Sequence, residues 1–240
     1  MTWPFENDTS GIVKRISNRS ISANRKRNIF IILTIALASA LLSAIVLYGF
    51  GVMQETQNRN QKTAQIMYHA ISEQQGQELY KQEEIAWVGE FFNAFSEQVN
   101  HSTVNFTYAN ADMLKSQSMP YSGDLPASEN EIVVQESFLD SLGYSNELGQ
   151  TIQIPFSDGT THDFKLTGIL DVKTGDIGRY TAIISKELVR QQYGDGGMID
   201  YYIGLKGAQN MSEEEATNYA NTLAQQLKIS DDNVIVRSTY

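Results

Sequence analysis

The sequence contains no cysteine among its 240 residues. A disulfide framework, a thiol nucleophile and a thiolate metal site are therefore excluded, although the absence does not indicate a cellular compartment. Histidine is also scarce. His69, His101 and His162 are far apart in the sequence, and each lies in or beside an expected strand. We therefore expect no histidine metal centre.

Common local signatures of catalysis are missing as well. No Gly-Xaa4-Gly-Lys-Ser/Thr phosphate loop occurs, so the chain supplies no ATPase of that type. The hydrolase patterns His-Glu-Xaa-Xaa-His, Gly-Xaa-Ser-Xaa-Gly and Ser-Xaa-Xaa-Lys are also absent. We expect no enzyme, no cofactor and no catalytic, cofactor-binding or metal-binding residues.

Basic residues are few in the larger part of the chain. Six of the 18 basic and two of the 28 acidic residues precede residue 29, which leaves 12 and 26 beyond it and a formal charge of −14 there. Nucleic acid requires a basic surface, so no nucleic-acid partner is expected.

One long apolar stretch stands out against this polar background. No charged residue occurs between Arg27 and Glu55, and as a helix the 24 residues from Ile29 to Val52 reach about 36 Å, slightly more than a hydrocarbon core of about 30 Å. We predict a transmembrane helix over residues 29–53. The alternatives are a fully buried helix of a soluble protein and a cleaved signal peptide, whose apolar core is usually only about 7 to 15 residues long.

The flanks of this helix indicate its direction in the membrane. Residues 1–28 carry the excess of basic residues that marks the cytoplasmic side. They form either a short helix on the inner membrane face, held partly by anionic lipid, or a disordered flank that only sets the topology. Residues 54–240 are then extracytoplasmic.

Small residues line one face of the predicted span, at Ala36, Ala40 and Ala44, with Ser39 and Ser43 beside them. This spacing lets another helix approach closely, so further transmembrane helices are expected partners, as is the lipid bilayer. The alternative is that alanine is simply common in membrane helices.

The remainder of the chain alternates between strand and helix patterns. Two strand-helix-strand patterns bracket a middle part of loops and hairpins. We predict an α+β fold with two lobes, an α+β lobe from residues 54–111 and 196–240 and an inserted β-rich lobe from residues 112–195. The strands are expected at 63–71, 85–95, 104–109, 131–134, 151–156, 162–169, 181–184, 199–205 and 233–237, and the helices at 72–82, 136–142, 185–193 and 212–228.

Several finer features support these elements. Ser72 with Gln75, and Ser212 with Glu215, form capping boxes at two helix starts, and Gly143 ends a third helix. Asp158-Gly159 is a hairpin turn signal. Residues 63–71 alternate as a half-buried strand does, with Ala64, Ile66, Tyr68 and Ala70 on one face.

Two groups of residues are candidate binding features. Trp87, Phe91, Phe92 and Phe95 either pack in the core, which we favour, or line a hydrophobic groove for a peptide or lipid. Four aspartates in glycine-containing connections offer calcium ligands, but their spacing is not that of an EF-hand, so we favour ordinary turn residues. These are Asp171, Asp176, Asp195 and Asp200.

Several segments together resemble a known family. They are the basic stretch from Ser20 to Asn28 before the span, Tyr68-His69-Ala70, the stretch from Gly123 to Val134 (Gly-Asp-Leu-Pro-Ala-Ser-Glu-Asn-Glu-Ile-Val-Val), Leu142-Gly143, Leu148 to Ile154 and Phe164 to Ile169. The sequence is similar to MacB/FtsX-like permeases of ABC transporters, particularly the Gram-positive branch, from about residue 12 to its end.

The resemblance implies a first transmembrane helix followed by an extracytoplasmic MacB-like core domain with a porter-like lobe and a second lobe. It also implies a partner ABC ATPase subunit or domain and the export of peptides, antibiotics or lipoproteins, or resistance to them. The family has about four spans in each permease, whereas this chain has one, so we expect the N-terminal part of a permease. Two alternatives remain, a signal-anchored extracellular binding or sensor protein and, less favoured, an anchored hydrolase.

Overall fold

The computed structural model describes residues 9–172, 179–194 and 199–236. Two compact units make up the chain, Met1–Thr56 and Gln57–Tyr240. The predicted features at Asp176, Asp195, Gly196, Gly197 and Arg237 lie outside the described residues.

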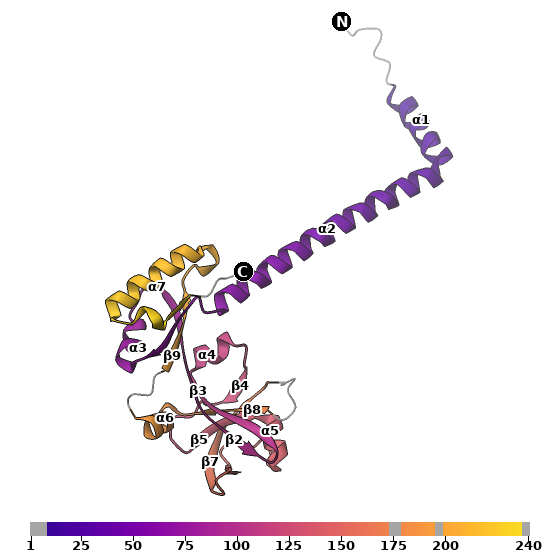
Figure 1. Cartoon of the computed structure of the whole chain (residues 1–240). Helices are drawn as coiled ribbons and strands as arrows, with labels where there is room; N and C mark the ends of the chain where they lie inside the picture. Colours follow the sequence, from indigo (N-terminus) through magenta and orange to yellow (C-terminus); the bar gives the residue numbers. More distant parts are fainter. Residues whose placement is uncertain (1–8, 173–178, 195–198, 237–240) are drawn as a thin grey trace. The chain divides into compact units, whose positions relative to one another are not determined.

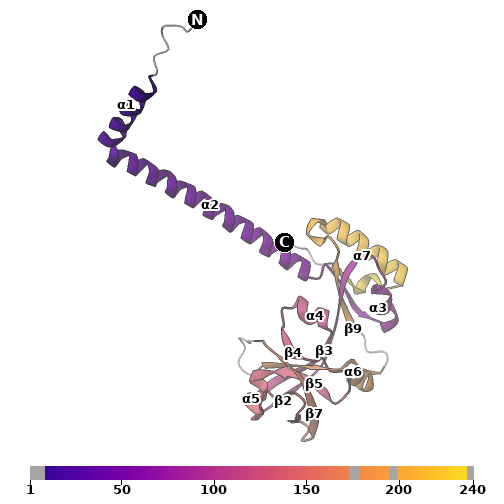
Figure 2. The same cartoon turned by 180° about the vertical axis from the view of Figure 1, so that it is seen from behind.

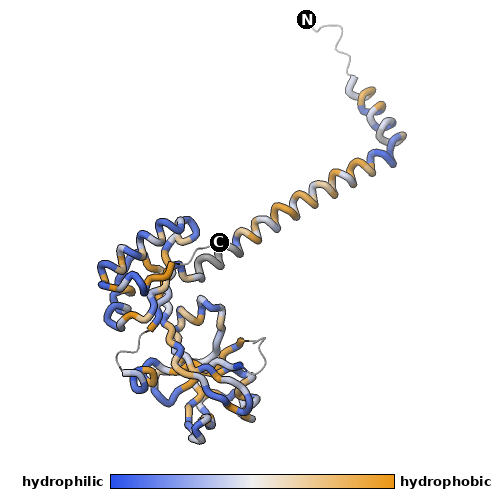
Figure 3. The backbone as a smooth tube through the Cα atoms, in the orientation of Figure 1, coloured by the Kyte–Doolittle hydropathy of each residue, from blue (hydrophilic) through white to orange (hydrophobic). Residues whose placement is uncertain are grey.

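The described part of the first unit is helical (Figure 1). Helix α1 spans Ser10–Ala23, and helix α2 spans Arg25–Lys62, so α2 continues past the end of this unit. From Arg25 to Gln54 the helix is long and apolar enough to cross a membrane (Figure 3). An apolar surface around the whole circumference suits lipid. A candidate transmembrane helix is therefore present where the span was predicted, and the polar residues after it extend the same helix.

The second unit contains a mixed sheet whose described strands follow the order β10-β1-β9-β2-β3-β8-β5-β7-β4, with β6 paired to β7. The strands are β1 Ile66–Ile71, β2 Ile85–Val99, β3 Ser102–Ala109, β4 Tyr121–Gly123, β5 Glu131–Gln135, β6 Thr151–Pro155, β7 Thr161–Leu170, β8 Arg179–Ile184, β9 Ile199–Leu205 and β10 Val234–Val236. The predicted mixture of helix and sheet is confirmed.

Helices α3 (Glu73–Leu79) and α7 (Glu213–Leu227) pack on the β10-β1-β9 end of the sheet (Figures 1 and 2). Both begin at the predicted capping boxes. The core here includes the fully buried rings of Tyr68 and Tyr201, and the Tyr68 hydroxyl donates a hydrogen bond to the Ala220 carbonyl at 3.0 Å. Long-range packing and one buried hydrogen bond thus fix α7 on the sheet.

Strands β2 and β3 form a long hairpin that links the two ends of the sheet. Up to Phe91 strand β2 pairs with β9, and from Phe91 onward it pairs with β3. The connecting turn has Asn100 and His101 at φ 49° and 67°, the left-handed pair that a two-residue hairpin requires. The same strand therefore contributes to each of the three hydrophobic clusters among the described residues.

The second cluster lies among β3, β5, β6, β7 and β8. Helix α5 (Glu136–Leu142) buries Phe138 and Leu139 there, and helix α6 (Lys186–Tyr193) buries Leu188 and Val189. Gly143 ends α5 at φ 78°, a conformation that favours glycine, as predicted. Ser185 caps α6, and its hydroxyl accepts a hydrogen bond from the Leu188 N–H.

Three local predictions need correction. Helix α4 (Ala111–Ser116) and strand β4 occupy positions where no regular element was expected. The first strand is not half-buried, because residues 66–68 are buried on both faces, and Ala70 leaves the expected alternation at a bulge where its φ is 50°. The predicted Asp158-Gly159 hairpin is present, but its loop runs from residue 156 to 160 between the paired residues Pro155 and Thr161.

Candidate functional site

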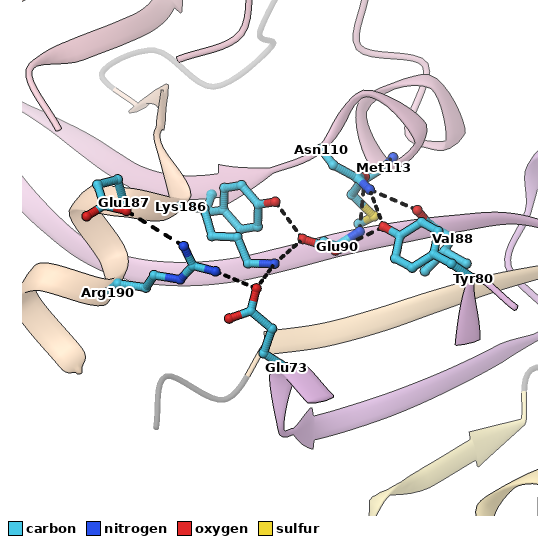
Figure 4. A network of polar contacts seen from close by, with 10 residues as sticks. Glu73, Tyr80, Val88, Glu90, Asn110, Met113, Lys186, Glu187 and Arg190 are labelled. Atoms are coloured by element: carbon cyan, nitrogen blue, oxygen red, sulfur yellow. Dashed lines mark hydrogen bonds and ion pairs between the residues drawn. The ribbon is translucent and has the colours of Figure 1, made fainter. Parts of the chain in front are cut away.

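A network of polar side chains lies where α3, β2, β3 and α6 meet (Figure 4). Its central carboxylate is buried, whereas Tyr80 and the Arg190 side chain at its edges are 47% and 40% exposed. At its centre is Glu90 on β2, a carboxylate that is only 4% exposed. The Tyr80 hydroxyl donates to Glu90 Oε1 at 2.9 Å, the Tyr108 hydroxyl donates to Oε2 at 2.5 Å, and Lys186 Nζ lies 3.0 Å from Oε2. A buried carboxylate is stable only with such partners, and both of its oxygens have them. We call this group, with the residues below, the Glu90 network.

Helix α6 supplies both cations of the network. Lys186 and Arg190 are one turn apart, and each also binds Glu73 on α3, with nitrogen–oxygen distances of 3.1 Å and 2.5 Å. The hydrogen bond from Arg190 lowers the pKa of Glu73; burial opposes this shift, and Lys186 adds to it. Two carboxylates and two cations thus join helices α3 and α6, which are more than 100 residues apart in sequence.

The tyrosines of the network remain protonated donors. Burial, and next the charge of Glu90, raise the pKa of Tyr80 and Tyr108 well above the usual range. Tyr201 nearby has its pKa raised by burial and by the charges of Glu90 and Glu73. Its buried hydroxyl has no hydrogen-bond partner in the described part of the chain. A methyl group at Gly76 on α3 would overlap the Tyr201 ring, which explains a glycine inside this helix.

Asn110 connects helix α4 to the network. Its Oδ1 accepts hydrogen bonds from the Met113 N–H at 2.9 Å and the Glu90 N–H at 3.0 Å. Its Nδ2 donates to the Val88 carbonyl at 2.9 Å and to the Tyr80 hydroxyl at 3.3 Å. One side chain therefore caps α4 and fixes the backbone of β2 on either side of Gly89.

The network is suited to holding α3, α6 and the β2-β3 hairpin together. The surrounding side chains bind both carboxylate oxygens of Glu90 and so tie these elements to one another. Among the described residues, no group of three or more His, Asp or Glu side chains is placed to hold a metal ion.

The candidate aromatic cluster is divided between the two faces of β2. Phe91 contacts Tyr202 edge to face at 6.4 Å between ring centroids, whereas Phe92 packs against Tyr193 at 5.2 Å and Phe95 stacks on Phe106 at 4.6 Å. Phe91 and Phe92 point to opposite faces because they are successive strand residues, and the register shift between Asn93 and Phe95 brings Phe95 to the face of Phe92. These rings therefore do not form a single groove.

The other candidates have ordinary structural partners. Asp200 Oδ1 lies 2.7 Å from His69 Nδ1 and accepts a hydrogen bond from the Ala70 N–H at the β1 bulge. His162 packs against Phe156 at 4.2 Å between ring centroids, and His101 lies in the β2-β3 turn. The described aspartates are not brought together into a calcium site.

Sequence analysis missed the Glu90 network. One signal was present, since Glu90 is a charged residue inside the apolar run from Ile85 to Phe95. A charge at such a position needs a buried partner. Its partner on α6, Lys186, is 96 residues away, and nothing local identifies it.

Comparison with known proteins identifies the family. The model of the MacB-like periplasmic core domain matches residues 29–223. The chain belongs to this family. No curated protein matches the sequence.

Solved structures share the fold at low sequence identity. The periplasmic region of MacB from Actinobacillus actinomycetemcomitans is 13% identical, with a TM-score of 0.50, over 72% of this chain and 87% of that one. The extracellular domain of the noncanonic ABC-type transporter YknZ from Gram-positive bacteria is 10% identical, with a TM-score of 0.52, over 73% and 100%. A domain of a putative permease protein from Porphyromonas gingivalis is 8% identical, with a TM-score of 0.53, over 73% and 88%. This chain therefore has the fold of MacB-like extracytoplasmic domains.

Proposed function

We propose that the chain is the N-terminal part of an ABC transporter permease whose extracytoplasmic domain is coupled to a cytoplasmic ATPase. The transporter exports peptides, antibiotics or lipoproteins, or gives resistance to them. The chain itself catalyses no reaction in this proposal. The family match over residues 29–223 and the ABC-type transporter among the solved structures of the same fold support it.

The family match over residues 29–223 carries the proposal. The segment between α2 and β1 adds a local observation. Three residues separate the end of α2 at Lys62 from the start of β1 at Ile66. In this segment Gln65 is 3% exposed, its N–H donates to the Ile203 carbonyl at 2.9 Å, and its Oε1 accepts from the Leu205 N–H at 2.9 Å. The segment between α2 and β1 is therefore short, and it is hydrogen-bonded to the neighbouring strand β9.

We infer that the sheet unit moves as two lobes, residues 54–111 with 196–240 and residues 112–195. One cluster of buried side chains, around β1, β9 and α7, lies in the first lobe. The cluster around β5, β7 and β8 lies mainly in the second lobe but also takes in Val104 and Phe106 of β3, so the second lobe packs on the β2-β3 hairpin of the first. The Glu90 network would then fix the angle between the lobes, since α3 belongs to the first and α6 to the second.

The N-terminus would be cytoplasmic and the sheet unit extracytoplasmic. The basic residues of α1 and at the start of α2 support this orientation, and they would also bind anionic lipid on the inner face. The face with Ala36, Ala40 and Ala44 would receive further permease helices.

The test is to purify the full chain, tagged at its N-terminus, from membranes of the organism that encodes it and to identify stoichiometric partners. A partner with a Gly-Xaa4-Gly-Lys-Ser/Thr loop and ATPase activity is the expected result. A stable assembly that lacks an ATPase, together with a reading frame that adds no further spans, would contradict it and favour an anchored binding or sensor protein.

A further inference from the structure

A cleft of about 440 Å³ lies on the sheet between β9, β2, β3 and β8, with α4 at its edge. Phe91 and Asn93 line it from β2, Asn105 from β3, Met113 from α4, Thr181 from β8 and Tyr202 from β9. Its volume is in the range of pockets that hold drug-sized molecules, roughly 300 to 1,000 Å³.

The apolar lining of the cleft includes an aromatic pair beside a methionine. Phe91 and Tyr202 meet edge to face at an interplanar angle of 87°, and Met113 lies beside them with its side chain buried. Aromatic rings and a flexible thioether accommodate a ring or a branched aliphatic group of varied shape.

The polar lining consists of amides and hydroxyls. Asn93 is exposed at the rim, Asn105 and Thr181 are half-buried, and Thr107 is 6% exposed. The Thr107 hydroxyl has no hydrogen-bond partner in the described part of the chain. Because this hydroxyl is buried, the polar side chains that a ligand can reach are those of Asn93, Asn105 and Thr181.

None of the residues that line the cleft is acidic or basic. This is notable in a segment with 26 acidic and 12 basic residues beyond residue 53. No cation is present to pair with an anionic ligand and no carboxylate to pair with a cationic one, so the desolvation of a charged ligand would be uncompensated.

We propose that this cleft binds an uncharged amphipathic molecule of drug size. A ring or branched aliphatic group of the ligand packs against Phe91, Tyr202 and Met113, and its amide, ester or hydroxyl groups pair with Asn93, Asn105 and Thr181. The binding itself does not depend on the proposed function. The inference rests on that function only where it treats the bound molecule as the class of substrate of the transporter.

A matched pair of photoreactive probes, one neutral and one anionic, tests whether the cleft prefers an uncharged ligand. The full chain, in nanodiscs of phosphatidylcholine, is irradiated with the neutral N-acetyl-benzoylphenylalanine amide or with the corresponding free carboxylate. Benzophenones react with methionine, so the labelled peptides report on Met113. We expect saturable labelling of Met113 by the amide, and a half-saturating concentration at least about tenfold higher for the carboxylate.

Two blocking variants and one control locate the labelling. Thr181→Trp fills the cleft and should abolish saturable labelling, and Asn93→Trp at the exposed rim should do the same if Thr181→Trp fails to fold. Thr161→Trp, at an exposed threonine on β7 outside the cleft, should leave labelling unchanged.

Equal labelling by both probes, labelling that does not saturate, or labelling unaffected by either blocking variant would overturn the inference. Saturable labelling in a protein without an ATPase partner would support ligand binding in the cleft and contradict the proposed transporter function. An ATPase partner without labelling would refute only the cleft.

Discussion

Glu90 and Phe91 are neighbours on β2, but they serve opposite faces of the sheet. The Glu90 carboxylate lies in the buried network with Tyr108 and Lys186, whereas the Phe91 ring lies against Tyr202 in the cleft. Thr107 and Tyr108 on β3 are divided in the same way. The Glu90 network and the cleft therefore lie on opposite faces of the same two strands. A shift of the β2 or β3 backbone at the cleft would also move the side chains of the network.

The Glu90–Lys186 pair should contribute strongly to stability. Breaking a buried pair leaves an uncompensated charge, so Glu90→Gln should lower the free energy of unfolding by about 3 kcal/mol. Lys186→Met should also lower the free energy of unfolding. In the double variant the loss of free energy should be smaller than the sum of the two single losses by about 1 kcal/mol or more. Denaturant unfolding of the full chain in detergent provides the measurement.

Lys165→Met is the matched control for this cycle. Lys165 pairs with Glu131 at 3.3 Å, but its side chain is 53% exposed. Lys165→Met should therefore lower the free energy of unfolding by less than about 1 kcal/mol. Strictly additive effects of the Glu90 and Lys186 substitutions would show that the pair is not coupled.

Tyr108 and Tyr201 should respond oppositely to removal of their hydroxyl groups. Tyr108→Phe removes a hydrogen bond to a charged, buried carboxylate and should cost about 1.5 to 3 kcal/mol. Tyr201→Phe removes a buried hydroxyl that has no partner among the described residues, so it should be neutral or stabilising. The melting temperatures of the two variants check this, and a loss in Tyr201→Phe similar to that in Tyr108→Phe would show that its hydroxyl is bonded.

The sequence predicts the local features of this fold well. The transmembrane stretch, the capping boxes at Ser72 and Ser212 and the glycine stop at Gly143 depend on residues within a few positions of one another, and all three are confirmed. Helix α4 was missed because its cap, Asn110, follows strand β3 directly and the helix has only six residues.

Long-range features could not be predicted in this way. The pairing of Glu73 with Arg190 joins residues 117 positions apart, and the parallel pairing of β3 with β8 brings Asn105 beside Thr181. Both depend on strand order, which no local pattern determines. The cleft depends on the same strand order, because its lining comes from four strands and one helix.

Acid should weaken the junction between α3 and α6 through Glu73. The pKa of Glu73 is lowered in the folded protein, chiefly by the hydrogen bond from Arg190, so the folded state favours its charged form. The stabilisation is present above the unfolded pKa of about 4.3 and is lost as the pH falls through the lower folded value. We expect Glu73→Gln to flatten the fall of the melting temperature below about pH 4 and to leave the slope between pH 5 and 7 unchanged. A variant whose melting temperature falls as steeply as that of the parent protein in acid would contradict this role.

The absence of cysteine allows a direct test of the orientation. Ser10→Cys and Thr161→Cys each introduce a single thiol at an exposed position, one on α1 and one on β7, on either side of the apolar helix. The basic residues before α2 predict a cytoplasmic N-terminus. In intact cells a membrane-impermeant maleimide should therefore label Thr161→Cys and leave Ser10→Cys unlabelled, whereas both should react after permeabilisation. The parent chain, which has no thiol, gives the background. Labelling of Ser10→Cys alone in intact cells would reverse the orientation, and would place the sheet unit and its cleft in the cytoplasm.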